Sequence, residues 1–164
     1  MSFENVKKKL GFGCMRLKMD GDKVDYNEFN KMIDAFIAAG FNYFDTAHGY
    51  IDGKSETAIR DCLSARYNRK DFILADKLSD WYFEKEEDIQ PLFESQLKLC
   101  GVEYFDFYLL HNVYEKSIHT YKNPDWKIVD YLLEQKKNGR IKHLGFSTHG
   151  SMEIMKEIIG NINK

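Results

Sequence analysis

The feature that most constrains this chain is a regular alternation of short apolar runs with longer segments of helical periodicity. The apolar run 41–47, for example, is followed by helical spacing over 55–67 and by another apolar run at 71–78. Strands that alternate with helices in this way predict a parallel sheet, because each connection must return to the same end of the sheet. The apolar runs are nearly continuous, as is typical of strands covered on both faces. We therefore expect an α/β protein.

The alternation predicts about five strand–helix units in a single domain, residues 1–164. The expected strands are 10–17, 41–47, 71–78, 104–112 and 141–150, and the expected helices are 26–40, 55–67, 86–101, 125–140 and 151–162. Asp25 directly precedes the first helix, and Ser55 is a possible N-cap of the second. Two architectures fit this order, an open doubly wound sheet and a (β/α)-barrel. A closed eight-stranded barrel typically needs about 250 residues, so a barrel of 164 residues would hold only the first five of its units.

Composition excludes several classes of protein. A hydrophobic fraction of 43% and an aromatic fraction of 15% are ample for a globular core. A net charge of −2 gives no electrostatic case for nucleic-acid binding, and no apolar run is long enough for a membrane span. The three cysteines, which lie far apart, have neither a disulfide pattern nor the spacing of a metal site. We expect a soluble cytoplasmic protein without a metal.

Polar residues follow four of the expected strands at the point where each strand ends. They are Asp45, His48 and Tyr50 after the second strand, Asp76 and Lys77 at the third, His111 and Asn112 at the fourth, and Ser147, Thr148 and His149 at the fifth. In both parallel architectures, ligands bind at the carboxyl ends of the strands. One polar residue at such a position often only faces solvent, but four strands with the same feature predict a shared site. Alternation along the strand directs Asp76 to the opposite face from Lys77.

The residue types at this site predict proton transfer to a carbonyl oxygen. A phenol is a poor acid at neutral pH unless a cation stands beside it, and Lys77 can supply that charge. Asp45 can hold Lys77 in place by a buried ion pair. Tyr50 would then protonate the oxygen of a carbonyl as it is reduced, and His111 would orient the carbonyl or share the proton. None of these groups can supply a hydride, so a cofactor would be required.

Five segments of the sequence together resemble successive signature segments of the aldo-keto reductase family. They are GFGCMRL, FNYFDTAHGYIDGKSE, LADKL, YFDFYLLHN and GRIKHLGFSTHG, in the order and at the spacing of the family. The resemblance implies a (β/α)8 TIM-barrel fold and the reduction of aldehydes and ketones with a nicotinamide cofactor, NADPH or NADH. It is closest to the branch that opens with GFGCMRL and can carry a C-terminal iron–sulfur segment. By position, the catalytic tetrad of the family falls on Asp45, Tyr50, Lys77 and His111, with Tyr50 as the general acid.

The resemblance also implies residues that bind the cofactor and the substrate. Ser147 matches the hydrogen-bond partner of the nicotinamide carboxamide, and Thr148 stands where the family often has asparagine. The other implied cofactor contacts are Gly13, Cys14, Asp45 and Asn112. His48, Trp81 and His149 are expected to line the pocket of a small-molecule carbonyl substrate.

A second hypothesis competes with an active enzyme. The family's segments for the pyrophosphate, the adenine and the 2′-phosphate lie mainly in the last three β/α units, which these 164 residues lack. The chain could therefore be a non-catalytic fragment that keeps the tetrad but cannot bind cofactor. A partial barrel leaves two unpaired strand edges, so we expect that the chain either self-associates through those edges, pairing two partial barrels, or was cut from a longer protein.

Overall fold

A five-stranded parallel sheet forms the centre of the protein. The computed structural model describes residues 5–162, so the ends of the expected domain, 1–4 and 163–164, lie outside the described residues. The sheet contains β1 (Gly11–Gly13), β4 (Tyr43–Asp45), β5 (Ile73–Leu78), β6 (Phe105–Val113) and β7 (Ile141–Thr148), in that order, and all four pairs are parallel. The prediction of five parallel strands is thus confirmed.

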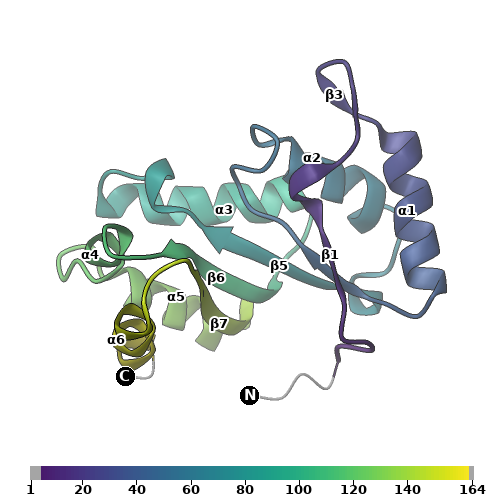
Figure 1. The fold of residues 1–164 in the computed structure, drawn as a ribbon. Coiled ribbons are helices and arrows are strands. Elements are labelled where there is room, and N and C mark those ends of the chain that lie inside the picture. The colour runs from purple at the N-terminus through teal and green to yellow at the C-terminus, as the bar shows by residue number, and fades with distance from the viewer. Residues whose placement is uncertain (1–4, 163–164) are drawn as a thin grey trace.

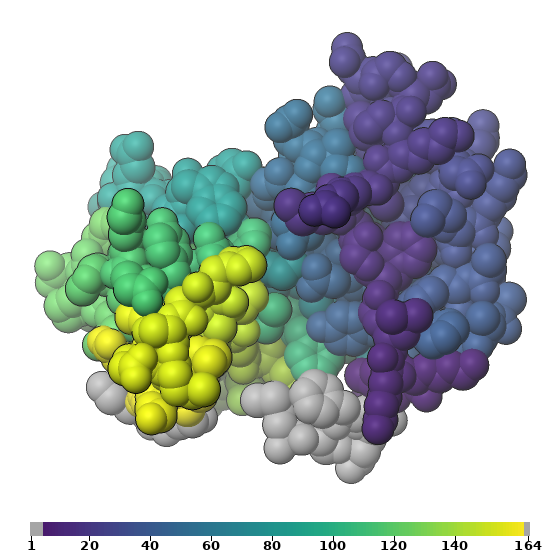
Figure 2. Space-filling view, viewed as in Figure 1, coloured from purple at the N-terminus to yellow at the C-terminus, as the bar shows by residue number. Residues whose placement is uncertain are grey.

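A helix follows each of the five strands and packs beside the sheet. They are α1 (Tyr26–Ala38), α2 (Lys54–Ile59), α3 (Ile89–Cys100), α5 (Ile128–Lys137) and α6 (Met152–Ile162). Figure 1 shows them around the row of strands, from α1 beside β1 to α5 and α6 near β7. In the space-filling view, the purple N-terminal segment and yellow α6 stand apart on the same face (Figure 2). Among the residues described, no helix is long and apolar enough to cross a membrane.

Several local expectations need correction. The first strand ends at Gly13 because a 3-10 turn, Cys14–Arg16, follows it, and a small antiparallel hairpin, β2 (Met19–Asp20) with β3 (Lys23–Val24), precedes α1. The short helix α4 (Ser117–Tyr121) was not predicted, and a single π-helical turn, Arg60–Ser64, continues α2.

The N-caps of α1 and α2 are of different kinds. Asp25, which directly precedes α1, is its N-cap, because its carboxylate accepts a hydrogen bond from the Glu28 amide at 3.0 Å. Ser55 is not the cap of α2, because Gly53 takes that position with a φ of 80°. Ser55 instead lies in the first turn of α2, and its buried hydroxyl group forms hydrogen bonds with Thr46 Oγ1 at 2.7 Å and with the Cys14 carbonyl at 2.9 Å.

Alternation along β5 separates its two faces. Leu74 and Leu78 belong to the large apolar core between the sheet and its helices, whereas Ile73 and Ala75 pack with Phe107 in a smaller cluster on the opposite face. All six residues of β5 are buried, which agrees with a strand that is covered on both sides. The alternation places Lys77 on the face of Ile73 and Ala75, and Asp76 on the face of the helices.

Two glycine substitutions should change stability in opposite directions. Gly101 ends α3 with a φ of 66°, and a Cβ there would lie 2.7 Å from Arg60 Cγ. Gly101→Ala should therefore lower the free energy of unfolding by about 1–2 kcal/mol or more. Gly160 lies inside α6, where a Cβ would meet no atom within 4 Å, so Gly160→Ala should raise it by up to about 1 kcal/mol. Urea denaturation of both variants measures the two changes, and equal effects would contradict this description of the two glycine positions.

Candidate active site

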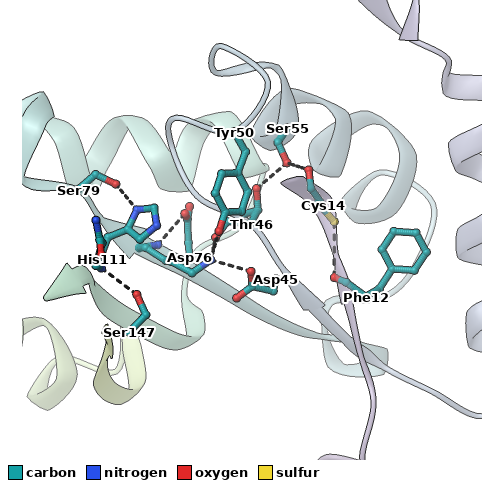
Figure 3. Close-up of polar contacts among 12 residues, drawn as sticks. Phe12, Cys14, Asp45, Thr46, Tyr50, Ser55, Asp76, Ser79, His111 and Ser147 are labelled. Atoms are coloured by element: carbon teal, nitrogen blue, oxygen red, sulfur yellow. Dashed lines mark hydrogen bonds and ion pairs between the residues drawn. The ribbon is translucent and has the colours of Figure 1, made fainter. Parts of the chain in front are cut away.

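Three neighbouring strands bring their polar ends together. Asp45 is the last residue of β4, Lys77 lies near the end of β5, and His111 lies near the end of β6. Because the strands are parallel and adjacent, their carboxyl ends share one edge of the sheet. Tyr50 comes from the loop that follows β4. Figure 3 shows the side chains of Asp45, Tyr50 and His111 gathered around the same space.

The ammonium group of Lys77 joins the members of this group. Its Nζ donates to Asp45 Oδ1 at 2.7 Å, to the Thr46 carbonyl at 2.7 Å and to the Tyr50 hydroxyl oxygen at 3.1 Å. The side chain is only 6% exposed, and a buried charge is tolerated when it is paired and hydrogen-bonded. An ammonium has three hydrogens, so these acceptors use all of its donors. Tyr50 accepts from Lys77, which leaves its own hydroxyl hydrogen free for another acceptor.

A tight turn holds Tyr50 in this position. The Tyr50 amide donates to the Ala47 carbonyl at 3.0 Å, and the Tyr50 carbonyl accepts from the Ser55 amide at 3.2 Å. The next residues, Ile51, Asp52 and Gly53, all have positive φ, at 54°, 53° and 80°. Positive φ is unusual for a β-branched residue such as Ile51, and such a conformation persists only where its surroundings enforce it. The unusual backbone conformation therefore directly follows Tyr50 in the chain.

His111 is an uncharged member of the group at neutral pH. Its Nδ1 lies 2.6 Å from Ser79 Oγ, and its ring stands nearly perpendicular to the Tyr50 ring, with 5.9 Å between the centroids. Burial, together with the nearby charges of Lys77 and His149, lowers the pKa of His111 to about 4. A neutral imidazole can hydrogen-bond a carbonyl oxygen without adding a second positive charge to the site.

Comparison with known proteins decides the family. The sequence model of the aldo/keto reductase family matches residues 9–163. The chain belongs to this family. The resemblance noted from the sequence is therefore confirmed, whereas its assignment to the branch with an iron–sulfur segment stays a prediction.

Individual relatives agree with the family. The chain is 28% identical to an uncharacterized oxidoreductase, YqkF, of Bacillus subtilis, over 94% of this chain and 49% of that protein. It is 30% identical to the aldo-keto reductase str7 of Strobilurus tenacellus, over 88% of this chain and 43% of that protein. The chain thus spans about half the length of the curated relatives that it matches.

Solved structures define the fold. The holo form of aldo-keto reductase AKR11C1 from Bacillus halodurans superposes with a TM-score of 0.75 and 28% identity, over 94% of this chain and 50% of that one. An aldo-keto reductase from Klebsiella pneumoniae in complex with NADPH has a TM-score of 0.73 at 21% identity, which shows the shared fold alone. The five strands and their helices are therefore part of a (β/α) TIM-type barrel, and the open doubly wound alternative is wrong.

The implied cofactor residues of this aldo-keto reductase chain fall into two groups. Gly13 borders open space, since a Cβ there would meet no atom within 4 Å, and it pairs with Asp45 in the sheet. Ser147 Oγ accepts the Asn112 amide at 2.9 Å, which leaves its own hydrogen free to donate to a carboxamide oxygen. Gly13 and Ser147 thus provide the space and the donor that the nicotinamide end of a cofactor would need.

Cys14 and Thr148 are engaged within the protein. The Cys14 side chain is fully buried, its thiol lies 3.8 Å from the Phe12 carbonyl, and burial raises the pKa of that thiol well above its usual value. Thr148 Oγ1 donates to the Val113 carbonyl at 2.6 Å and accepts from the Gly150 amide at 2.9 Å. A cofactor would therefore meet Cys14 only through its backbone, and Thr148 shapes the end of β7.

The expected pocket residues lie near the tetrad. The Trp81 ring is 54% exposed, and its centroid lies 5.0 Å from that of His111. The His48 ring packs edge-on against Tyr82 at 4.7 Å. His149 is exposed and close enough to affect His111 electrostatically. Trp81 and Tyr82 thus form an aromatic wall beside the tetrad.

Two contributors were missed by the sequence reasoning. Ser79 bonds His111, and Glu56 accepts from or donates to His48 Nδ1 at 2.8 Å. Glu56 had a detectable signal, because it stands three residues before Ile59 and so lies on the apolar face of its helix. An acid on the buried face of a helix is unusual and indicates a specific partner.

The lysine at the centre of the site can be tested through His111. In Lys77→Met the pKa of His111 should rise from about 4 toward its usual value but stop below it, because burial remains the larger cause. Nuclear magnetic resonance (NMR) titration of the histidine ring measures this change, and Lys31→Met, which alters a 77% exposed lysine, is the control. An unchanged pKa of His111 in Lys77→Met would contradict the described electrostatics.

The low pKa of His111 also predicts how stability depends on pH. As the pH falls, the His111 ring is protonated in the unfolded chain before it is protonated in the folded protein. The free energy of unfolding should therefore decrease as the pH falls from about 6.5 to about 4.

Proposed function

We propose that this protein reduces an aldehyde or a ketone with a nicotinamide cofactor and that Tyr50 is the general acid. The observation that carries the proposal is the pair of contacts from Lys77 Nζ, 2.7 Å to Asp45 and 3.1 Å to the Tyr50 hydroxyl. Family membership supports this reaction class.

The residues of this chain would each hold or move a group near the reacting carbonyl. Tyr50 donates its free hydroxyl hydrogen to the carbonyl oxygen as negative charge develops there. The ammonium of Lys77 stabilises the phenolate that remains, and Asp45 keeps the ammonium in place. Neutral His111, held by Ser79, orients the carbonyl oxygen toward Tyr50.

A reduced nicotinamide cofactor, when bound, would supply the hydride. Ser147 and Asn112 would hold its carboxamide end, and the backbone at Gly13 and Cys14, with Asp45, would border its ribose. We propose NADPH, with NADH tested in parallel. Support comes from solved relatives in complex with NADPH and NADP, and from an aryl-alcohol dehydrogenase [NADP(+)] of Phanerodontia chrysosporium, 45% identical over 30% of this chain.

The substrate pocket would be lined by His48, Trp81 and His149. The aromatic wall at Trp81 suits an apolar or aromatic carbonyl compound.

A cytoplasmic location fits the three free cysteines, which are all buried.

A non-catalytic role for this chain remains the competing candidate. β1 and β7 are the two edge strands of the sheet, and an open edge favours pairing with another strand. Self-association through these edges would stabilise the chain whether or not it binds a cofactor.

Carbonyl reduction should depend on Tyr50. We expect NADPH oxidation with a panel of aldehydes and ketones, and a loss of about 10²–10⁴-fold in kcat in Tyr50→Phe, because the proton donor is removed. Tyr26→Phe, at an exposed tyrosine that contacts Asp61, is the matched control and should keep full activity. A fully active Tyr50→Phe would refute the assigned acid. A folded but inactive unsubstituted protein would favour the non-catalytic role.

Pairing through the open strand edges should increase the mass of the protein in solution. We expect sedimentation analysis to give about twice the 19.3 kDa mass of the chain, because edge strands of two copies can pair. A monomer that persists at high protein concentration would contradict this expectation.

A further inference from the structure

A buried group of acids lies directly behind the tetrad, on the helix-facing side of β5. It consists of Glu56 from α2, Asp76 from β5 and Cys100 from α3, each 0% exposed. Their side-chain oxygen and sulfur atoms lie within 4.8 Å of one another. Asp76 is the neighbour of Lys77 in the sequence, and its Oδ1 accepts the Lys77 amide at 2.8 Å. The tetrad does not use this group.

One oxygen in the group lacks a donor. Glu56 Oε1 is buried and accepts no hydrogen bond from the described residues, although the Gln96 side chain lies near enough to act on the Glu56 carboxyl group. Two neighbouring carboxylates in a dry interior also repel each other strongly. A single proton between Glu56 and Asp76 removes both problems, because a protonated Asp76 can donate to Glu56. Such a pair carries one negative charge in place of two.

The pair is connected to the mouth of the site through His48. Glu56 Oε2 lies 2.8 Å from His48 Nδ1, while His48 Nε2 has no hydrogen-bond partner within residues 5–162. The His48 side chain is 19% exposed, whereas Glu56 is closed off from solvent. A change in the protonation of Glu56 must therefore change the hydrogen bond that the His48 ring makes through Nδ1.

We propose that Glu56 and Asp76 share a proton and that the protonation of Glu56 sets the tautomer of His48, and so the hydrogen-bonding character of Nε2 at the mouth. When Glu56 is ionised, His48 Nδ1 donates to it and Nε2 is an acceptor. When Glu56 is protonated, it donates to Nδ1 and Nε2 carries the ring hydrogen. In passing from the protonated to the ionised state, the Glu56 proton moves to Nδ1 and the Nε2 proton leaves to solvent, so one proton is released. Glu56 and Asp76 are thus positioning residues for His48.

The electrostatics of the surrounding groups support this assignment. Burial raises the pKa of Glu56 to about 7. Burial and the charge of the neighbouring Glu56 carboxylate raise the pKa of Asp76 well above its usual value. Burial lowers the pKa of His48, which favours a neutral ring. Both shifts favour the retention of a proton by the pair, as the shared proton requires. The titratable groups that face the pair from the packed elements are His48, Lys77, Cys100 and Tyr108.

A proton fits this group better than a metal ion does. The Cys100 thiol lies 3.6 Å from Asp76 Oδ2, and burial raises the pKa of that thiol well above its usual value. A thiol that stays protonated is a poor metal ligand.

The inference concerns the same mouth as the proposed function, but its test needs neither cofactor nor substrate. NMR of ¹⁵N-labelled histidine distinguishes the two tautomers of His48 directly. We expect a switch from Nε2–H to Nδ1–H as the pH rises through about 7. The switch should be absent in Glu56→Gln and should remain in Asp76→Asn, because an asparagine amide can donate to Glu56 as a protonated Asp76 does. Glu87→Gln, at a glutamate that is 77% exposed, should behave as the unsubstituted protein.

A single tautomer of His48 on both sides of neutral pH in the unsubstituted protein would overturn the proposal, as would a switch that survives in Glu56→Gln. If Glu56→Gln does not fold, infrared spectroscopy of the unsubstituted protein decides. We expect protonated carboxyl groups that persist well above the usual pKa of Asp and Glu, with one lost near pH about 7. No protonated carboxyl group at pH about 6 would refute the shared proton.

Discussion

The buried ammonium of Lys77 is the interaction on which the site depends. Removing such a charge from water costs several kcal/mol, and the cost is offset only when partners surround it. Asp45, Thr46 and Tyr50 are those partners, and they come from the end of β4 and the loop that follows it. The need to satisfy one charge therefore fixes the relative positions of two β/α units and leaves the Tyr50 hydroxyl ready to donate.

Strand alternation gives β5 two different chemical faces. Lys77 faces the mouth of the barrel, whereas Asp76 faces the helices, where it meets Glu56 and Cys100. The backbone amide of Lys77 donates to Asp76, so the two faces are linked within two residues. His48 links them a second time, because it contacts Glu56 on one side and Tyr82 on the other.

Much of this arrangement could be predicted from the sequence. The five strands follow from apolar runs, and the convergence of Asp45, Lys77 and His111 follows from the rule that parallel strands share one carboxyl edge. The β2–β3 hairpin could not be found in this way, because each of its strands has only two residues and too few positions to show alternation. The cap of α2 was missed because Ser55 can hydrogen-bond across the fold, to Cys14 and Thr46, as readily as to its own helix. The pairing of Glu56 with Asp76 depends on tertiary packing between α2 and β5, which no local pattern specifies.

Titration of NADPH and NADH into the protein, followed by nicotinamide fluorescence, tests the central claim most directly. If the Lys77-centred group, Gly13 and Ser147 form a working nicotinamide site, binding should saturate at micromolar cofactor. A folded protein that binds neither cofactor would contradict the account, because the tetrad would then stand beside no source of hydride.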